Sequence, residues 1–181
     1  MANQIVRTAG ALPFDAIPTY KITRYPLEEG WYKPFAQGQL VLAGEELVAR
    51  LWAFEAAPER RSALALCLEP APGRALAVGF SADGDAWCFI DGRPAPSPGR
   101  ITPLGGEDLQ GIYWGGMIHL GLGALEEALG EPARLQRRAR LNLYKLLERG
   151  ERPHLGAAFD FDPRKDLWAP GQLAAFSVED F

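Results

Sequence analysis

The strongest constraint on the fold is a set of short segments in which apolar residues alternate along the chain. Leu47, Ala49 and Leu51 share one face of residues 46–54. This period of two places successive side chains on opposite faces of a β-strand. Turn signals, among them the hairpin pair Asp83-Gly84, separate the segments at about the 8–12-residue spacing of an antiparallel sandwich or barrel. The same period recurs in residues 62–68, 74–80 and 86–90.

Weaker signals extend this meander in both directions. Residues 123–130 predict one short helix that ends at Gly130. Residues 93–99 carry three prolines, so we expect a surface loop there. Further strands are predicted at residues 19–25, 38–42, 112–120, 155–161 and 173–178.

The segment that follows the predicted helix has two possible periods. Leu135, Ala139 and Leu143 recur every four residues, which by itself favours a helix. Ala139, Leu141 and Leu143 also alternate with polar residues, which favours a strand. Taken alone, the pattern favours a helix over residues 133–149.

The composition is that of an ordinary folded globule. The chain has 181 residues, a size that fits one domain over residues 1–181, and 48% of them are hydrophobic. Its 19 Lys+Arg against 23 Asp+Glu give a net charge of −4, which argues against a nucleic-acid partner. No apolar run approaches the roughly 20 residues of a membrane span. Residues 1–8 lack the pattern of a secretory signal, so we expect a soluble, cytoplasmic protein without a membrane partner.

The cysteines and histidines do not indicate a metal or redox site. Cys67 and Cys88 each lie in an apolar run and form no Cys-x-x-Cys pair, so we expect two reduced, buried thiols. His119 and His154 lie at no zinc-ligand spacing with either cysteine.

Charged clusters offer little chemistry. No nucleophile elbow, phosphate loop or dinucleotide fingerprint is present. Adjacent glutamate pairs indicate solvated faces rather than the paired carboxylates of a glycosidase. A basic run indicates a solvated face or a patch for an anionic ligand; its members are Arg134, Arg137, Arg138, Arg140 and Lys145. Asp160, Asp162 and Asp166 form a loose acidic cluster that Pro163 interrupts, so we expect no cofactor and leave calcium there as the alternative.

The five tryptophans divide by context. Trp52 and Trp87 lie in apolar strands and are predicted to be core, whereas Trp31 and Trp114 are undecided. Trp168 follows a polar stretch and precedes Ala169-Pro170-Gly171, which places it on a loop. A loop tryptophan among polar groups serves as a stacking platform or as a buried anchor of its loop.

The order of several C-terminal motifs resembles the family-9 carbohydrate-binding modules, and especially the stand-alone bacterial proteins similar to them. The resemblance spans residues 20–180, and residues 62–70 match it more weakly. Its motifs are Gly111-Ile112-Tyr113-Trp114-Gly115, Leu141-Asn142-Leu143-Tyr144-Lys145, Pro153-His154-Leu155-Gly156, and Asp162-Pro163 with Trp168.

The resemblance implies an all-β, antiparallel sandwich of the immunoglobulin or jelly-roll kind, with residues 139–145 as a strand. It also implies sugar binding, with Trp168 as one of two clamp tryptophans. Tyr144 falls on a sugar-contacting strand position and Lys165 near a contacting loop residue; Asn142 is the fourth expected contact.

The sequence departs from the family at three other site positions. Glu59 stands near the second clamp tryptophan, Ala65 at a site glutamate and Ala77 near a site arginine. Each desolvated sugar hydroxyl needs a hydrogen-bond partner, so these losses predict weak binding, a different ligand or none.

The leading hypothesis is therefore non-catalytic carbohydrate binding at Trp168, Tyr144, Asn142 and Lys165, by stacking and by hydrogen bonds to hydroxyls. The alternative is a structural or interaction protein of the same fold that has lost the sugar site. A third reading is an enzyme that acts on glycosides, against which the missing carboxylate pair argues.

Overall fold

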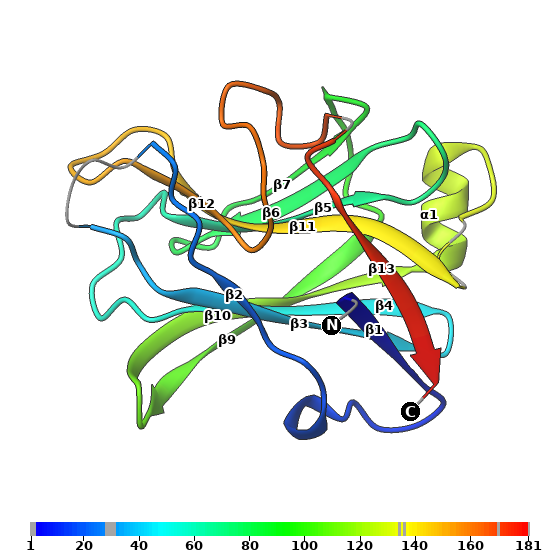
Figure 1. The fold of residues 1–181 in the computed structure, drawn as a ribbon, viewed down its shortest axis with the longest axis horizontal. Coiled ribbons are helices and arrows are strands. Elements are labelled where there is room, and N and C mark those ends of the chain that lie inside the picture. The colour runs from blue at the N-terminus through cyan, green and yellow to red at the C-terminus, as the bar shows by residue number, and fades with distance from the viewer. Residues whose placement is uncertain (1–2, 28–31, 134, 136, 170, 181) are drawn as a thin grey trace.

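The computed structural model describes residues 3–27, 32–133, 135, 137–169 and 171–180. These residues form thirteen strands, one α-helix and one short 3-10 helix, Phe14–Ala16 (Figure 1). The strands are β1 (Asn3–Thr8), β2 (Tyr20–Ile22), β3 (Ala36–Ala43), β4 (Glu46–Ala53), β5 (Ala63–Glu69), β6 (Leu76–Ser81), β7 (Ala86–Ile90), β8 (Arg93–Pro94), β9 (Gly99–Asp108), β10 (Gly111–Gly121), β11 (Arg138–Leu147), β12 (His154–Ala157) and β13 (Ala174–Asp180).

One curled sheet supplies two facing layers. Its strand order is β8-β7-β6-β5-β11-β13-β1-β3-β4-β10-β9, with β12 paired to β11 and β2 to β3. In Figure 1 the upper layer holds β5, β6, β7 and β11, and the lower layer holds β3, β4, β9 and β10. At one side of the molecule β13 and β1 connect the layers.

The predicted antiparallel sheet is wrong at one strand. β1 pairs in parallel with both β13 and β3, so the sheet is mixed. The two terminal strands lie side by side with Asn3 opposite Phe176, a pairing between chain ends that no local pattern encodes. The expectation of a mostly β fold with one short helix is confirmed.

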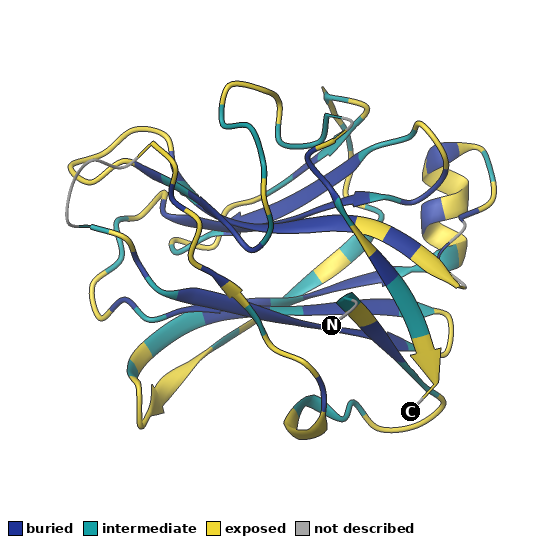
Figure 2. Ribbon diagram, in the orientation of Figure 1, coloured by how far each residue is buried: buried dark blue, intermediate teal, exposed yellow. Residues whose placement is uncertain are grey.

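The core lies between the layers and follows the alternation of the sequence. Leu47 and Leu51 of β4 and Leu64 and Leu66 of β5 enter the same buried cluster. Figure 2 shows the central parts of both layers as buried, whereas the tip of the β9–β10 hairpin is exposed. The other face of β5 is also buried, because Ala65 and neighbouring residues belong to a second apolar cluster. The upper layer therefore needs a cover on its outer face.

The two-period segment is a strand, as the resemblance implied. β11 pairs with β5 in a register that sets Leu143 opposite Leu66. Ala139, Leu141 and Leu143 all enter the inter-layer core. The four-residue spacing that favours a helix is thus a by-product of leucines on one face of a strand and in the segment before it.

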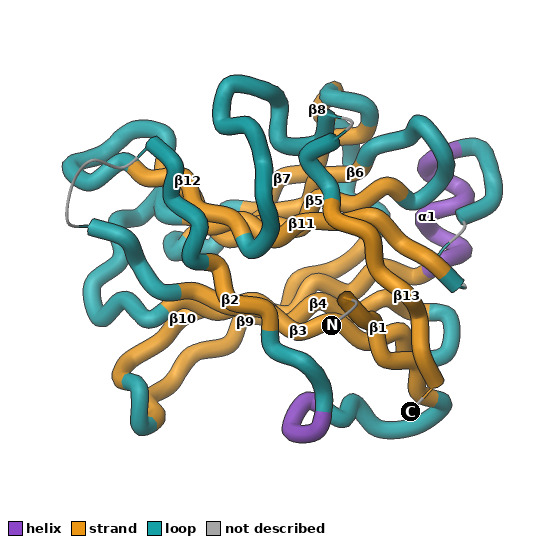
Figure 3. The backbone as a smooth tube through the Cα atoms, viewed as in Figure 1, coloured by secondary structure: helices purple, strands orange, loops and turns teal. Residues whose placement is uncertain are grey.

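The helix lies where it was expected. α1 spans Leu122–Leu129, and Gly130 ends it in the left-handed conformation at φ 70° with its N–H bonded to the Glu126 carbonyl. Figure 3 shows α1 at one end of the layers and a long irregular segment between β12 and β13. No helix in the described ranges is long and apolar enough to cross a membrane.

Several strand boundaries differ from the prediction. The predicted strand at residues 155–161 ends at Ala157 and continues as irregular backbone. β1 and β9 were not predicted, because their sequences are polar or rich in glycine. β9 is an edge strand, which is why it tolerates Pro103.

Gly115 of β10 is expected to be intolerant of a side chain. A Cβ at this position would collide with the Leu51 carbonyl and lie 2.7 Å from the Trp52 Cα, so the strands would have to separate. Gly115→Ala should lower the free energy of unfolding by about 1–3 kcal/mol in urea titrations. Gly121→Ala, in open space at the end of the same strand, is the control and should be near neutral. Equal effects of the two substitutions would contradict the proposed collision.

Candidate functional site

Two buried side chains of β11 hold the segment that carries Trp168 on the outer face of the upper layer. The Asn142 amide donates to the carbonyls of Phe159 and Gln172, at 3.3 and 3.0 Å. Its oxygen accepts from the Phe159 N–H at 3.1 Å. The Tyr144 hydroxyl donates to the Leu167 carbonyl at 3.1 Å. Both residues are 0% exposed, so they offer no surface to a sugar. They anchor the irregular segment of residues 158–169 and 171–173, here called the covering segment.

Gln172 completes this anchor from within the segment. Its side-chain nitrogen donates to the Asp162 carbonyl at 2.7 Å, and its oxygen accepts from the Asp162 N–H at 2.9 Å. The two bonds close the irregular stretch between residues 162 and 172. Gln172 could not be predicted from the sequence, since a lone glutamine before a strand carries no local signal.

Trp168 belongs to a row of three half-buried rings, here called the aromatic strip. Its indole stacks on Phe89 at 5.5 Å between centroids and 13° between planes. Phe89 in turn meets Trp87 edge to face at 5.8 Å. Gly92 makes room for the indole, because a Cβ there would lie 3.0 Å from the indole nitrogen. Trp87 was predicted to be core, but it is partly exposed on the outer face.

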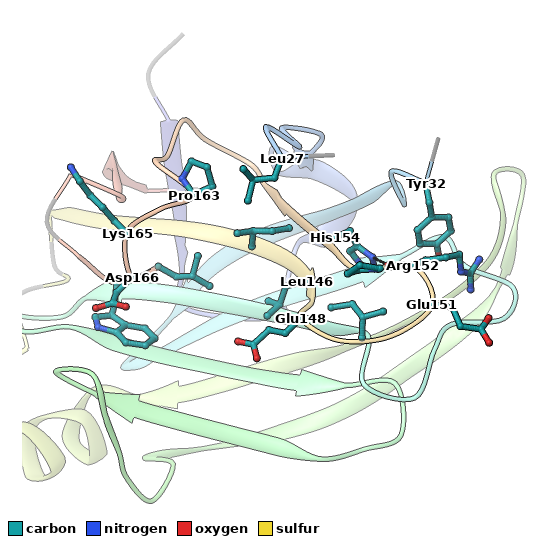
Figure 4. Close-up of a pocket in the computed structure, with 15 residues that line it drawn as sticks. Leu27, Tyr32, Leu146, Glu148, Glu151, Arg152, His154, Pro163, Lys165 and Asp166 are labelled. Carbon is teal, nitrogen blue, oxygen red and sulfur yellow. Dashed lines mark hydrogen bonds between the residues drawn. The ribbon is translucent and has the colours of Figure 1, made fainter. Parts of the chain in front are cut away.

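Trp168 lines two grooves. The first, the Lys165 groove, has a volume of about 810 Å³, and the second, the Trp87 groove, about 560 Å³. In Figure 4 Lys165 and Asp166 lie at one end of the Lys165 groove, and Tyr32 and Arg152 lie at the other. Both grooves are lined by Leu146, Leu147, Glu148, Leu167 and Trp168.

The four residues predicted to contact sugar therefore divide into two pairs. Trp168 and Lys165 line the Lys165 groove. The Lys165 side chain is exposed, with its ammonium 3.9 Å from the Asp162 carboxylate. Asn142 and Tyr144 lie beneath the covering segment and bond to the protein itself.

A buried ion pair connects the two layers below the Lys165 groove. The Lys145 ammonium donates to the Glu55 carboxylate at 3.0 Å, to the Ser62 hydroxyl and to His154 Nε2 at 2.8 Å. Its side chain is 0% exposed, so all three N–H donors have an acceptor inside the protein. Trp114 donates its indole N–H to Glu55 at 3.0 Å. This assigns the tryptophan that the sequence left undecided to a structural role.

The environment sets the charge state of this cluster. Burial lowers the pKa of Lys145 to about 8, against the opposing effect of the Glu55 carboxylate. Burial alone would raise the pKa of Glu55, but the Lys145 ammonium and the hydrogen bonds it receives outweigh burial and lower it. Burial and the same ammonium lower the pKa of His154. His154 Nδ1 donates to the Arg152 carbonyl at 2.7 Å, which leaves Nε2 free to accept from Lys145.

The positions that depart from the family pattern have structural roles here. Ala65 and Ala77 are buried in the outer-face cluster together with Tyr144. The Glu59 carboxylate accepts from the backbone N–H groups of Glu151 and Arg152, both at 2.9 Å. At these three positions the chain therefore has apolar packing and a loop cap.

The remaining candidate ligands are engaged elsewhere. Cys67 and Cys88 are buried free thiols, as predicted, and burial raises the pKa of Cys88 to about 11. Asp160 pairs with Arg24 at 2.7 Å, and Asp162 pairs with basic neighbours. Within the described ranges no group of three or more His, Cys, Asp or Glu side chains is placed to hold a metal ion.

Two candidate residues lie outside the described part of the chain. They are Trp31, left undecided above, and Arg134, the first member of the basic run.

Comparison with known proteins identifies the fold. No family model and no curated protein matches the sequence. A proposed carbohydrate-binding protein from Bacteroides uniformis ATCC 8492 superposes with a TM-score of 0.76 at 12% identity, over 99% of this chain and 100% of that one. The chain thus has the fold of carbohydrate-binding proteins of this type.

Two structures of a family-9 carbohydrate-binding module from Caldicellulosiruptor kristjanssonii also match. The complex with cellotriose gives a TM-score of 0.65 at 9% identity, covering 99% of this chain and 94% of that chain. The complex with glucose gives 0.63 at 11%, covering 99% and 97%. The mostly β fold that the resemblance implies is therefore confirmed, although its sheet is mixed rather than purely antiparallel.

Acidification is expected to destabilise the protein through His154. Its pKa lies below the ordinary 6.5, so the unfolded chain binds this proton more readily. The free energy of unfolding should therefore fall as pH drops through and below 6.5. The limit for one proton is about 1.4 kcal/mol per pH unit.

Urea unfolding at about pH 7.5 and about pH 5.5 would measure this loss. His154→Gln keeps an acceptor for Lys145 but cannot be protonated, so its stability should change less between the two pH values. His119 is present in both proteins. The same pH dependence in both would mean that His154 is not the group responsible.

Loss of the Asn142 amide is expected to loosen the covering segment. Asn142→Ala would leave buried backbone groups without partners, at a cost of about 1–3 kcal/mol. Hydrogen exchange should become faster in residues 158–173 while β3 and β4 stay protected. Asn3→Ala, which removes one exposed amide bond, is the control. Unchanged protection of residues 158–173 would contradict the anchoring role.

Proposed function

We propose that this protein is a non-catalytic carbohydrate-binding protein whose site is the pair of grooves at Trp168. The observation that carries the proposal is the aromatic strip, which is half-exposed between grooves with charged rims. An aromatic surface stacks on the C–H face of a sugar ring, while polar groups at its edge satisfy the hydroxyls. The fold, shared with modules solved with cellotriose and glucose, supports this assignment.

Exposed side chains at the rims supply the polar partners. Arg61, Asp85 and Arg149 line the Trp87 groove, and Lys165 and Glu151 line the Lys165 groove. Guanidinium and ammonium groups donate hydrogen bonds and carboxylates accept them, so both functions of a hydroxyl can be matched. The site therefore uses Trp168 and Lys165 from the predicted set and replaces Asn142 and Tyr144 with rim residues.

The groove carboxylates favour binding over catalysis. The general acid of a glycosidase gains its raised pKa from burial in an apolar environment. Glu148, Glu151 and Asp166 are all exposed, so none lies in such an environment. We accordingly propose no reaction at this site.

A second function is favoured by the packing beneath the site. Ala65, Ala77 and Tyr144 are buried under the covering segment, so these three residues form no polar sugar site. A protein that kept the fold for structural or interaction purposes alone would show the same packing. The aromatic strip favours carbohydrate binding over this structural or interaction role, because a structural or interaction role does not require half-exposed stacked rings.

Trp168→Ala is expected to weaken sugar binding by at least about tenfold, because the central ring of the platform is lost. Isothermal titration calorimetry with glucans and other oligosaccharides would measure the change. Phe54→Ala is the matched control, since Phe54 stacks on Phe35 at 5.6 Å and 22° and lines neither groove. Binding that survives Trp168→Ala, or its absence in the wild-type protein across a broad glycan array, would reject the proposed site.

A further inference from the structure

We propose that the two grooves act together and bind an internal stretch of an oligosaccharide, with sugar units on both sides of Trp168. This inference rests on the proposed carbohydrate function and specifies its ligand class. It concerns the length of chain bound and the way the chain crosses the site.

The first argument is that the grooves share a floor. Leu146, Leu147 and Glu148 line both of them, as do Leu167 and Trp168. These residues come from the end of β11 and from the covering segment, which the Tyr144 hydroxyl holds together through the Leu167 carbonyl. A ligand seated on Trp168 is therefore next to residues that line both grooves.

The second argument is size. Volumes of about 810 and 560 Å³ each fall in the range of a complete small-molecule site. A single sugar ring on Trp168 would leave most of this space to water. A chain that runs from one groove to the other would use both.

The third argument is that each groove has its own aromatic and charged groups beyond the shared floor. The Trp87 groove adds Trp87 with Arg61 and Arg149. The Lys165 groove adds Tyr32, whose hydroxyl is fixed by the Glu55 carboxylate and whose ring is covered by the Arg152 guanidinium at 4.1 Å from its centroid. The Trp87 groove thus adds a further ring for stacking, and the Lys165 groove adds polar groups for the hydroxyls of further sugar units.

Fixed geometry supports this ligand class. The floor is a β-strand end, and the walls are tied to it by buried hydrogen bonds of Asn142 and Gln172. A preformed groove loses less conformational entropy on binding than a mobile one. The path of the chain is thus set before the ligand arrives.

The test uses length-matched series of β-1,4-glucan, chitin, xylan and α-1,4-glucan oligosaccharides of two to six units. For the series that binds, affinity measured by calorimetry should rise by about tenfold or more from the shortest to the longest member, equivalent to about 1.4 kcal/mol. Equal affinity for all lengths would overturn the two-groove inference and leave the Trp168 site intact. No binding to any series would overturn the proposed function as well.

Surface variants test whether the Trp87 groove and the Lys165 groove each contribute to binding. Arg61→Ala with Arg149→Ala alters only the Trp87 groove, and Glu151→Ala with Lys165→Ala alters only the Lys165 groove. Each pair should weaken binding of the longest oligosaccharide severalfold and leave the shortest that binds at Trp168 less affected. Arg137→Ala with Arg138→Ala, outside both grooves, is the control. If one pair of substitutions leaves the affinity for the longest oligosaccharide unchanged, the groove that it alters is not part of the site and the inference fails.

Discussion

The apolar outer face of the upper layer must be shielded from water, and the position of the site depends on the segment that shields it. β5 and β11 are buried on both faces, and irregular backbone between β12 and β13 provides the cover. The N–H and C=O groups of buried irregular backbone have no neighbouring strand or helical turn to bond to, so they need other hydrogen-bond partners. Asn142 and Gln172 supply those partners. The same bonds that solve this problem place Trp168 at the meeting point of two grooves.

This constraint explains which parts of the site could be predicted from sequence. Alternation identified most strands, and the loop setting of Trp168 predicted either a stacking platform or a buried anchor of its loop. The family resemblance predicts Asn142 and Tyr144 as ligand contacts, whereas the structure shows both bonded to the covering segment. Their partners lie 17 to 30 residues later in the chain, and a local pattern contains no information on such bonds. The parallel pairing of β1 with β13 was missed for the same reason, since it joins the two ends of the chain.

The buried position of Lys145 could have been predicted from the alternation of β11, but its charge suggested an exposed side chain. It lies in register with Ala139, Leu141 and Leu143 on the inward face of β11, so parity alone places it between the layers. Grouping it with exposed arginines as a basic patch was wrong, because its side chain is 0% exposed. A buried charge is tolerated only with close and complete pairing. Glu55 and two neutral acceptors provide that pairing from elements distant in sequence.

The chain shares its fold with solved structures to which it is only 9–12% identical. Core volume and alternation are sufficient to retain a sandwich, whereas ligand chemistry depends on individual outward side chains. On the outer face, Ala65 and Ala77 pack with aromatic and leucine side chains in one apolar cluster. Under the proposed function, stacking then comes from a fixed strip and hydrogen bonding from long, exposed side chains. Such a site gains affinity from the number of rings it contacts more than from the identity of each hydroxyl, because flexible partners discriminate weakly between hydroxyl geometries.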